Sequence, residues 1–242
     1  MIQPLTLIVL HTRPYKESSL LVYAYTNVYG RQNYVLKGIR RPQHKALAAL
    51  FHPLSLLEAQ AYYNPKNDLQ YLKEYHRATL LDNICCDVRK NAMALFMGEL
   101  LYKSVREVEA NPALFSFIEQ SVLELEQARD NMSNNHLVFA TRLTRYLGYQ
   151  PQPDYSPQTP YFNIAAARFT ALPDPDPEGF DKETSRMLFD FLQGNSSSQD
   201  TVACNGEKRY AFLKQLLQYY DFHMEKHLDL QSPGVLHQIF TR

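Results

Sequence analysis

The sequence predicts an α+β fold in which a five-stranded OB-type β-barrel precedes an all-helical C-terminal domain with a short hairpin insertion. Two patterns support this class. Five strand-length apolar runs lie within about the first 77 residues, and from about residue 80 apolar residues recur near the 3.6-residue period of helices. We therefore expect an OB-fold domain at residues 1–80 and a helical domain at residues 81–242.

The expected strands cover residues 5–11, 20–26, 32–37, 54–63 and 69–77. Turn-forming residues separate the second strand from the third at 27–30 and the fourth from the fifth at 64–68. The longer crossing at 38–49 fits a small closed Greek-key barrel of the OB type, whose open face and loops commonly hold oligonucleotides. An SH3-like barrel would give nearly the same pattern.

Helices are expected at residues 89–110, 112–125, 133–147, 182–193, 207–228 and 233–240. Asn111-Pro112 and Ser232-Pro233 each read as an N-cap followed by proline at the first helical position, and Gly148 as a C-terminal stop. Residues 150–177 interrupt the helices with seven of the fourteen prolines around a strand-like pair at 161–164 and 167–171. The polar segment 194–206 is expected to be a surface loop.

The first fifty residues carry a strong excess of positive charge. They contain seven Lys and Arg side chains against one acid, Glu17, whereas the whole chain is balanced at 25 basic and 25 acidic residues. The other 192 residues therefore hold 18 basic and 24 acidic side chains, a net charge of minus six. This asymmetry indicates a cationic region with a polyanionic partner.

Tyrosines are interleaved with these cations, and a nucleic-acid strand binds such a surface because cations neutralise phosphates and ring faces stack on bases. The predicted DNA-binding residues are Arg13, Lys16, Arg31, Lys37, Arg40, Arg41, Lys45, Tyr15 and Tyr34. A solvated surface with tyrosines completing the core is the alternative, which we favour for Tyr23 and Tyr25. For Arg40 and Arg41 we favour binding, because adjacent cations repel one another unless an anion is present.

No motif indicates an enzyme: the sequence lacks a phosphate-binding Gly-Lys-Ser/Thr loop, a dinucleotide-binding glycine pattern and a nucleophile elbow. His223 and His227 have no third ligand in view, and Cys85, Cys86 and Cys204 lack the paired spacing of a zinc site. We therefore predict no catalysis, metal or other cofactor. No apolar run is long enough for a signal peptide or a membrane span, so we expect a cytoplasmic protein without a membrane partner.

Several segments of the chain have an order and spacing shared with a known family. They are residues 9–20 (VLHTRPYKESSL), Thr26 with Gly30-Arg31, residues 36–41 (LKGIRR), residues 145–151 (RYLGYQP), and His227-Leu228 followed by Gln231-Ser232. They resemble RecO, the family of bacterial recombination mediators and DNA repair proteins. The resemblance covers both predicted domains and is strongest over the first 41 residues.

The resemblance implies an OB barrel, a helical domain and a non-enzymatic role in gap and break repair. Such proteins bind single- and double-stranded DNA, anneal complementary strands coated by single-stranded DNA-binding protein, and with RecR help to load RecA on coated DNA. The acidic, apolar tail of the single-stranded DNA-binding protein docks on the helical domain in this family. Arg142 and Arg145 are our candidates for binding its terminal carboxylate.

The insertion departs from the family pattern. Many relatives carry a four-cysteine zinc site there, but residues 150–177 of this chain contain no cysteine. Zinc is therefore not carried over. The hairpin is expected to be held by the packing of residues such as Tyr161, Phe162 and Phe169.

Two other functions fit the same charge pattern. The barrel could be an adaptor for an acidic protein partner, with the acidic helical body as the working surface, or it could bind RNA. RNA is the poorer alternative, because nothing in the sequence specifies a ribose hydroxyl. An adaptor would ignore an oligonucleotide at low salt.

Overall fold

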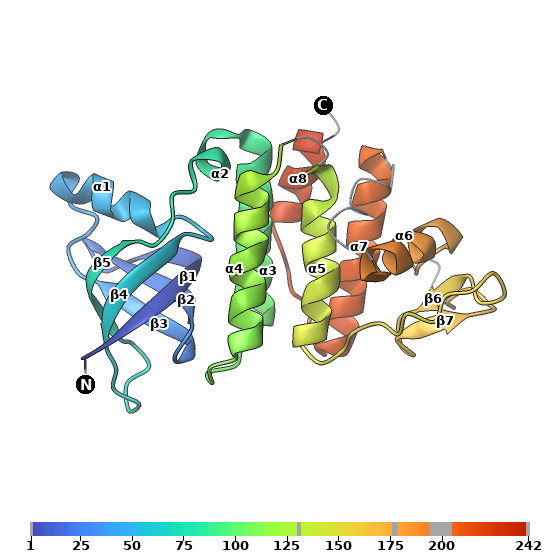
Figure 1. Ribbon diagram of the computed structural model, residues 1–242, viewed down its shortest axis with the longest axis horizontal. Helices are drawn as coiled ribbons and strands as arrows, with labels where there is room; N and C mark the ends of the chain where they lie inside the picture. Colours follow the sequence, from blue (N-terminus) through green and yellow to red (C-terminus); the bar gives the residue numbers. More distant parts are fainter. Residues whose placement is uncertain (1, 130–131, 176–178, 194–204, 241–242) are drawn as a thin grey trace. The chain divides into compact units, whose positions relative to one another are not determined.

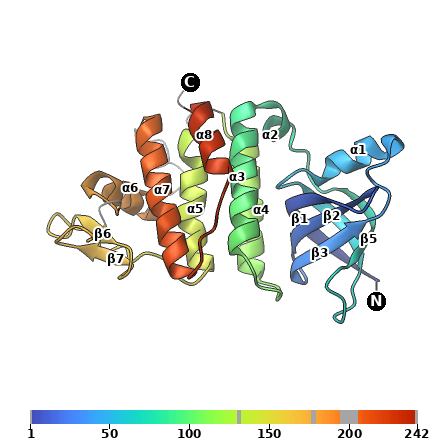
Figure 2. The ribbon, with the colours of Figure 1, turned by 180° about the vertical axis from the view of Figure 1, so that it is seen from behind.

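The computed structural model describes residues 2–129, 132–175, 179–193 and 205–240. The chain forms two compact units, residues 1–127 and 128–242, and Figures 1 and 2 show the elements within each unit. The first unit contains a β-sheet and helices, and the second contains helices and a two-stranded hairpin. Among the described residues, no helix combines the length and the hydropathy that a membrane span requires.

A five-stranded antiparallel sheet opens the first unit. Its strands are β1 (Ile2–Tyr15), β2 (Ser19–Thr26), β3 (Gly30–Leu36), β4 (Leu56–Tyr62) and β5 (Tyr71–Arg77), in the order β3-β2-β1-β4-β5. The long strand β1 pairs with β4 through its first half and with β2 through its second half. The five predicted strands and the α+β class with a mostly helical remainder are thereby confirmed.

The sheet curls round but is not closed into a barrel. Its edges are β3 and β5, and an isolated parallel bridge at Gln70, directly before β5, joins them. The Gln70 N–H donates to the Asn33 carbonyl at 2.8 Å, and the Gln70 carbonyl accepts from the Val35 N–H at 2.9 Å. Farther along β3, the Arg31 N–H donates to the Glu107 carbonyl at 3.0 Å. The predicted closed barrel is thus corrected to a curled sheet. The segment that contains Glu107 binds part of the β3 edge, so β5 does not pair along the whole of β3.

The inside of the curled sheet holds an apolar core. Side chains alternate between the two faces of a strand, so every second residue points inward. The core residues are Leu5, Leu7, Val9, Val22, Ala24, Tyr34, Leu36, Ile39, Phe51, Leu57, Ala59 and Ala61. Phe51 comes from the connection between β3 and β4, which contains the short helix α1 (Lys45–Ala48) between two 3₁₀ turns where the sequence predicted an irregular crossing.

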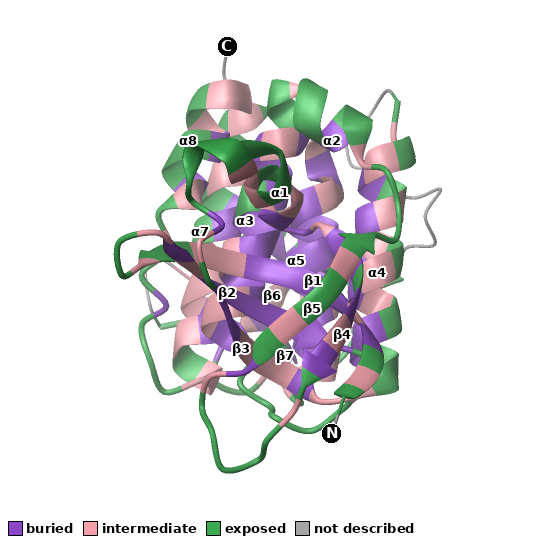
Figure 3. Cartoon of the chain, turned by 90° about the vertical axis from the view of Figure 1, so that its left-hand side faces the viewer, coloured by how far each residue is buried: buried purple, intermediate pink, exposed green. Residues whose placement is uncertain are grey.

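Three helices complete the first unit: α2 (Asp82–Cys86), α3 (Val88–Ser104) and α4 (Pro112–Gln127). Helix α4 begins as predicted, with Pro112 at its first position and the Leu114 N–H donating to Asn111 Oδ1 at 3.1 Å. Helix α3 covers the outer face of β1 and β2, and it approaches so closely that a Cβ on Gly98 would lie 2.9 Å from the Leu10 carbonyl oxygen. Figure 3 shows that β2 is mainly buried whereas β5 is mainly exposed.

The second unit packs α5 (Asn135–Tyr146), α6 (Lys182–Gln193), α7 (Gly206–His223) and α8 (Ser232–Phe240) with a hairpin of β6 (Tyr161–Asn163) and β7 (Arg168–Thr170). Helix α6 has its predicted bounds, and Gly148 takes the expected left-handed conformation with φ of 87°. Buried aromatic rings form much of the core of the second unit: Phe162, Phe169, Phe180, Phe191, Phe212, Tyr219 and Tyr220. Most of the predicted loop at 194–206, together with Cys204 and Pro177, lies outside the described residues.

Candidate nucleic-acid interface

The β1–β2 turn and the segment after β3 are joined by a backbone hydrogen bond. Leu20 pairs with Leu36 in the β2–β3 ladder, so the start of β2 and the end of β3 lie side by side. The Arg40 N–H then donates to the Ser18 carbonyl at 3.0 Å. The topology therefore brings the basic residues of both segments to one end of the curled sheet.

Six of the seven predicted basic residues are exposed, and we name them the cationic cluster: Arg13, Lys16, Lys37, Arg40, Arg41 and Lys45. No ion pair joins any of the six to a carboxylate within the described ranges. Six grouped cations near a single acid, Glu17, raise the surface potential, which attracts a polyanion. This arrangement can bind phosphates.

The turn after β3 fixes the backbone of the cluster. Gly38 has φ of 70°, a left-handed conformation that glycine adopts without steric cost. The Arg41 N–H donates to the Gly38 carbonyl at 3.2 Å, and His44 Nδ1 lies 3.1 Å from the same oxygen. The turn leaves the side chains of Arg40 and Arg41 exposed.

Tyrosine rings lie beneath three of these cations. The pairs are Arg13 with Tyr23 at 5.5 Å, Lys16 with Tyr15 at 5.5 Å, and Lys37 with Tyr71 at 4.9 Å from the ring centroid. Such contacts hold long cationic side chains near one position without neutralising them. Tyr15, a predicted binding residue, is half-buried and packs beside Leu21 and Val35.

Arg31 differs from the other predicted cations because its guanidinium binds the protein itself. Its Nη1 donates to the Tyr102 carbonyl at 2.9 Å and also to the Val105 carbonyl, and its guanidinium carbon lies 5.0 Å from the Tyr102 ring centroid. Burial lowers the pKa of Arg31 from its usual value, while Tyr102 acts in the opposite direction. We therefore assign Arg31 to the junction of β3 with α3 and leave it out of the proposed interface.

Tyr34 is fully buried in the core, where its ring cannot stack on a base. Burial also raises the pKa of its hydroxyl above the usual range. The prediction for Tyr34 is corrected accordingly: its face of β3 points inward together with that of Leu36. Tyr23 and Tyr25 are buried, as the core alternative predicted, and burial raises the pKa of Tyr25 to about 12.

Two exposed tyrosines were not predicted as binding residues. Tyr62 on β4 and Tyr71 on β5 are paired in the β4–β5 ladder, and both side chains remain exposed. Alternation along β4 could have predicted that Tyr62 is exposed, because Tyr62 is adjacent to the buried Ala61 and shares a face with Gln60. Tyr71 follows a loop of polar residues, so its position could be assigned only through its pairing with β4.

Arg142 and Arg145, the predicted residues for an acidic tail, lie three positions apart on α5. Residues at this spacing lie on one side of a helix. Arg142 is half-buried and already has an interaction partner, whereas Arg145 is exposed near the C-terminal end of α5. Arg145 is therefore the better placed of the two for a carboxylate.

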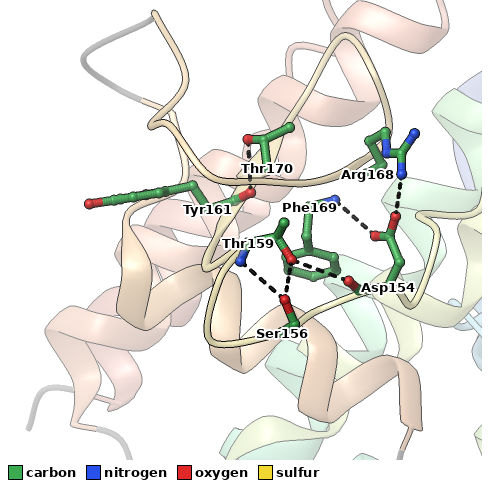
Figure 4. Close-up of polar contacts among 7 residues, drawn as sticks. All are labelled: Asp154, Ser156, Thr159, Tyr161, Arg168, Phe169 and Thr170. Carbon is green, nitrogen blue, oxygen red and sulfur yellow. Dashed lines mark hydrogen bonds and ion pairs between the residues drawn. The ribbon is translucent and has the colours of Figure 1, made fainter.

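Asp154 ties the hairpin insertion together (Figure 4). Its Oδ1 accepts from the Phe169 N–H at 3.0 Å, and its Oδ2 accepts from Arg168 Nη2 at 3.1 Å. The hydroxyls of Ser156 and Thr159 lie 2.7 Å apart, and the Thr159 N–H donates to Ser156 Oγ at 3.2 Å. The Asp154 bonds link the segment before β6 to β7, and the Ser156–Thr159 bonds hold that segment in a turn.

Aromatic packing lies beneath this polar network. The Phe162 ring lies 5.2 Å from the Phe169 ring and 5.2 Å from the Phe180 ring, and all three are buried. The predicted packing of Phe162 and Phe169 is confirmed, whereas Tyr161 is half-buried with the Lys182 ammonium over its ring.

A zinc ion does not fit this insertion, because residues 150–177 contain no cysteine and both carboxylate oxygens of Asp154 are engaged. His223 Nε2 lies 2.9 Å from the Ile164 carbonyl oxygen, and His227 Nδ1 lies 2.6 Å from Asp221 Oδ2. In the part of the chain that the structure describes, no three His, Cys, Asp or Glu side chains are grouped so as to hold a metal ion.

Two family models match the chain. The model described as "Recombination protein O N terminal" matches residues 2–79, and the model described as "Recombination protein O C terminal" matches residues 86–231. Together they cover the sheet, its connections and most of the helices.

Curated relatives match over nearly the whole chain, and the three described next are each named DNA repair protein RecO. The one from Bacteroides fragilis is 31% identical over 241 residues, which is 99% of this chain and 100% of the relative. The one from Christiangramia forsetii is 32% identical over 96% of this chain and 97% of the relative. The one from Porphyromonas gingivalis is 29% identical, again over 96% and 97%.

Proposed function

We propose, since this chain belongs to the RecO family of DNA repair proteins, that it binds single- and double-stranded DNA through the cationic cluster. The observation that carries this proposal is the convergence of six exposed cations at one end of the sheet, fixed by the hydrogen bond from Arg40 to Ser18. Phosphate contacts of this kind supply affinity without sequence preference. We assign DNA binding to residues 1–80 and contacts with partner proteins to residues 81–242.

The same cluster accounts for strand annealing. Two complementary strands repel each other through their phosphates, and a surface that neutralises both backbones lowers this repulsion. Base pairing then drives the reaction, so no catalytic residue or nucleotide cofactor is required. A non-enzymatic role in recombination follows from this chemistry.

The wider proposal is that of a mediator, which with RecR helps RecA to load on DNA coated by single-stranded DNA-binding protein. A mediator must hold DNA weakly enough to release it and must also contact the protein that coats the strand. We propose that the acidic tail of that protein docks near Arg145, with Arg142 on the same side of α5. An arginine can bind a terminal carboxylate through two parallel charge-assisted hydrogen bonds.

The central test is the double variant Arg40→Ala/Arg41→Ala of the full chain. Fluorescence anisotropy of a labelled single strand, measured over a series of salt concentrations, gives both affinity and salt dependence. We expect weaker binding of every sequence, and a salt slope reduced by about 0.7 for each phosphate that the variant no longer neutralises. Lys214→Ala/Lys226→Ala is the matched control, because it removes two exposed cations from the second unit.

Unchanged affinity and slope in the Arg40/Arg41 variant would remove these residues from the interface. If the unchanged protein ignored DNA at low salt but bound an acidic protein partner, the adaptor function would replace the proposal. A parallel titration with RNA of the same sequence tests the remaining alternative, because a preference for RNA would require recognition of the 2′-hydroxyl.

A further inference from the structure

A row of three exposed apolar side chains crosses the open face of the sheet. Ile2 on β1 pairs with Tyr62 on β4, and Tyr62 pairs with Tyr71 on β5. Directly paired residues on antiparallel strands project from the same face. This is the outer face, because the sequence neighbour Ala61 belongs to the core and Leu72 packs against the core. The three residues are 46%, 44% and 42% exposed.

On β2, by contrast, the tyrosines of the outer face are buried. Tyr23 and Tyr25 on β2 are only 9% and 0% exposed, and the Tyr23 ring lies 4.7 Å from the Tyr102 ring of α3. Helix α3 therefore covers the outer face of β2, while Tyr62 and Tyr71 remain open to solvent. Exposed apolar side chains that are grouped together are typical of a binding surface.

The charges around this row indicate what would bind there. At the β5 end, the Lys37 ammonium of the cationic cluster lies 4.9 Å from the Tyr71 ring centroid. Two residues away along β4, an open groove of about 440 Å³ begins, and its lining includes Gln60, Glu58 and Glu74. A phosphate backbone is attracted to the first region and repelled by the second. A bound strand would therefore keep its phosphates beside Lys37.

We propose that Tyr62 and Tyr71 form a stacking platform for unpaired bases, and that this platform makes the protein bind a single strand more tightly than a duplex. The inference rests on the proposed function, because the cationic cluster must bind the backbone first. In a duplex, each base face is covered by its neighbours in the stack, so a duplex would contact the cations alone. An unpaired base offers a free face, and every base can stack on tyrosine, so the platform selects strandedness and not sequence.

The test compares a labelled single strand with a duplex of the same sequence, using the full chain and the variant Tyr62→Ala/Tyr71→Ala. We expect a loss of about tenfold in affinity for the single strand, equal to ~1.4 kcal/mol. This lies within the range of about 1–3 kcal/mol that the stacking of one base contributes. We expect less than about a twofold change for the duplex, because its phosphate contacts are retained.

Two controls isolate the rings. Tyr62→Phe/Tyr71→Phe keeps both ring faces and should bind the single strand within about twofold of the unchanged protein, since stacking needs no hydroxyl. Phe222→Ala removes an exposed ring on α7, which is 53% exposed, and should bind both forms as before. Melting curves by circular dichroism should confirm that all variants fold.

Equal losses on single strand and duplex, or full retention of single-strand affinity by the alanine variant, would overturn the platform but leave the cationic cluster in place. A change confined to the binding of a protein partner would instead assign the row to a protein interface and would also overturn the inference. If the unchanged protein bound neither form of DNA, the proposed function would fail together with the platform.

Discussion

The guanidinium of Arg31 on β3 donates a hydrogen bond to the backbone carbonyl of Tyr102 on α3 at 2.9 Å. A second bond from the same nitrogen reaches the Val105 carbonyl. The last carbonyls of a helix have no donor within the helix, and the C-terminal end of the helix dipole favours a cation. Arg31 therefore caps α3 from the sheet, and it anchors the helix that covers the outer face.

Arg31→Ala should reduce the free energy of unfolding by about 2 kcal/mol, because hydrogen bonds made by charged groups are worth roughly 1.5–3 kcal/mol. Denaturant unfolding of the full chain measures this loss. The salt slope for DNA binding should stay unchanged. Arg40→Ala is the matched control and should show the reverse pattern, with intact stability and weaker DNA binding. A stable Arg31→Ala variant with a reduced salt slope would return Arg31 to the interface.

The Glu126 carboxylate on α4 anchors the start of α2. It accepts from the backbone N–H groups of Asn83 and Ile84, each at 2.9 Å, and from Asn83 Nδ2 at 2.8 Å. Glu126→Ala should lower the free energy of unfolding by about 2 kcal/mol, as expected for the loss of charged acceptors at a helix N-terminus. Glu126→Gln should lose less, because its amide oxygen still accepts. The exposed Glu124 provides the control variant, and equal stability of both alanine variants would contradict the anchoring role.

Elements with a clear cap or period could be predicted from sequence, whereas the shortest helices could not, and two long helices end before their predicted residues 110 and 228: α3 at Ser104 and α7 at His223. The bounds of α6 and the Asn111-Pro112 start of α4 follow local rules of capping and periodicity. The five residues of α2 and the four of α1 are too short to show a helical period. The curl of the sheet brings Gln70 to Tyr34 on β3, a contact that no local pattern specifies.

Exposed residues of the candidate site could be predicted from sequence where their charge alone determines their exposure. Arg40 and Arg41 follow a glycine turn and are exposed, as a cation-rich loop suggests. Arg31 has the same charge, but its role depends on the end of α3, which lies about seventy positions later in the chain. Tyr34 shares its strand face with Leu36, so alternation along β3 already contained the signal that its ring is buried. The tyrosine platform depends on strand pairing and could not be inferred from either segment alone.

The hairpin insertion should be stable without metal. Asp154 binds Phe169 N–H and Arg168 through its two carboxylate oxygens, so Asp154→Ala should lower the melting temperature by several degrees through loss of about 1–2 kcal/mol. Addition of a chelator such as EDTA should leave the melting temperature of the unchanged protein as it is. Asp154→Asn is the informative comparison, because it keeps one acceptor. A large drop in melting temperature on chelation would show that a metal stabilises the chain after all.

Buried His136 on α5 should make stability fall in mild acid. Its ring stacks on Phe240 at 6.0 Å, and burial, followed by the charge of Arg209, lowers its pKa to about 3 from an unfolded value near 6.5. The unfolded chain therefore binds a proton that the folded chain rejects. The resulting stability is complete above pH ~6.5 and declines as pH falls toward ~3. Between pH ~6.5 and ~5 the loss should be about 1.5 kcal/mol.

Denaturant unfolding at several pH values measures this loss, and His136→Leu should remove it, because leucine cannot titrate. His227→Leu is the control, since its ring is exposed and its removal should leave the acid-dependent loss in place. Equal pH dependence in the unchanged protein and in His136→Leu would mean that the pKa of His136 is the same in the folded and unfolded states. The sign of the effect is the sharper criterion, because a histidine stabilised as a cation would make the protein more stable, not less, as the pH falls.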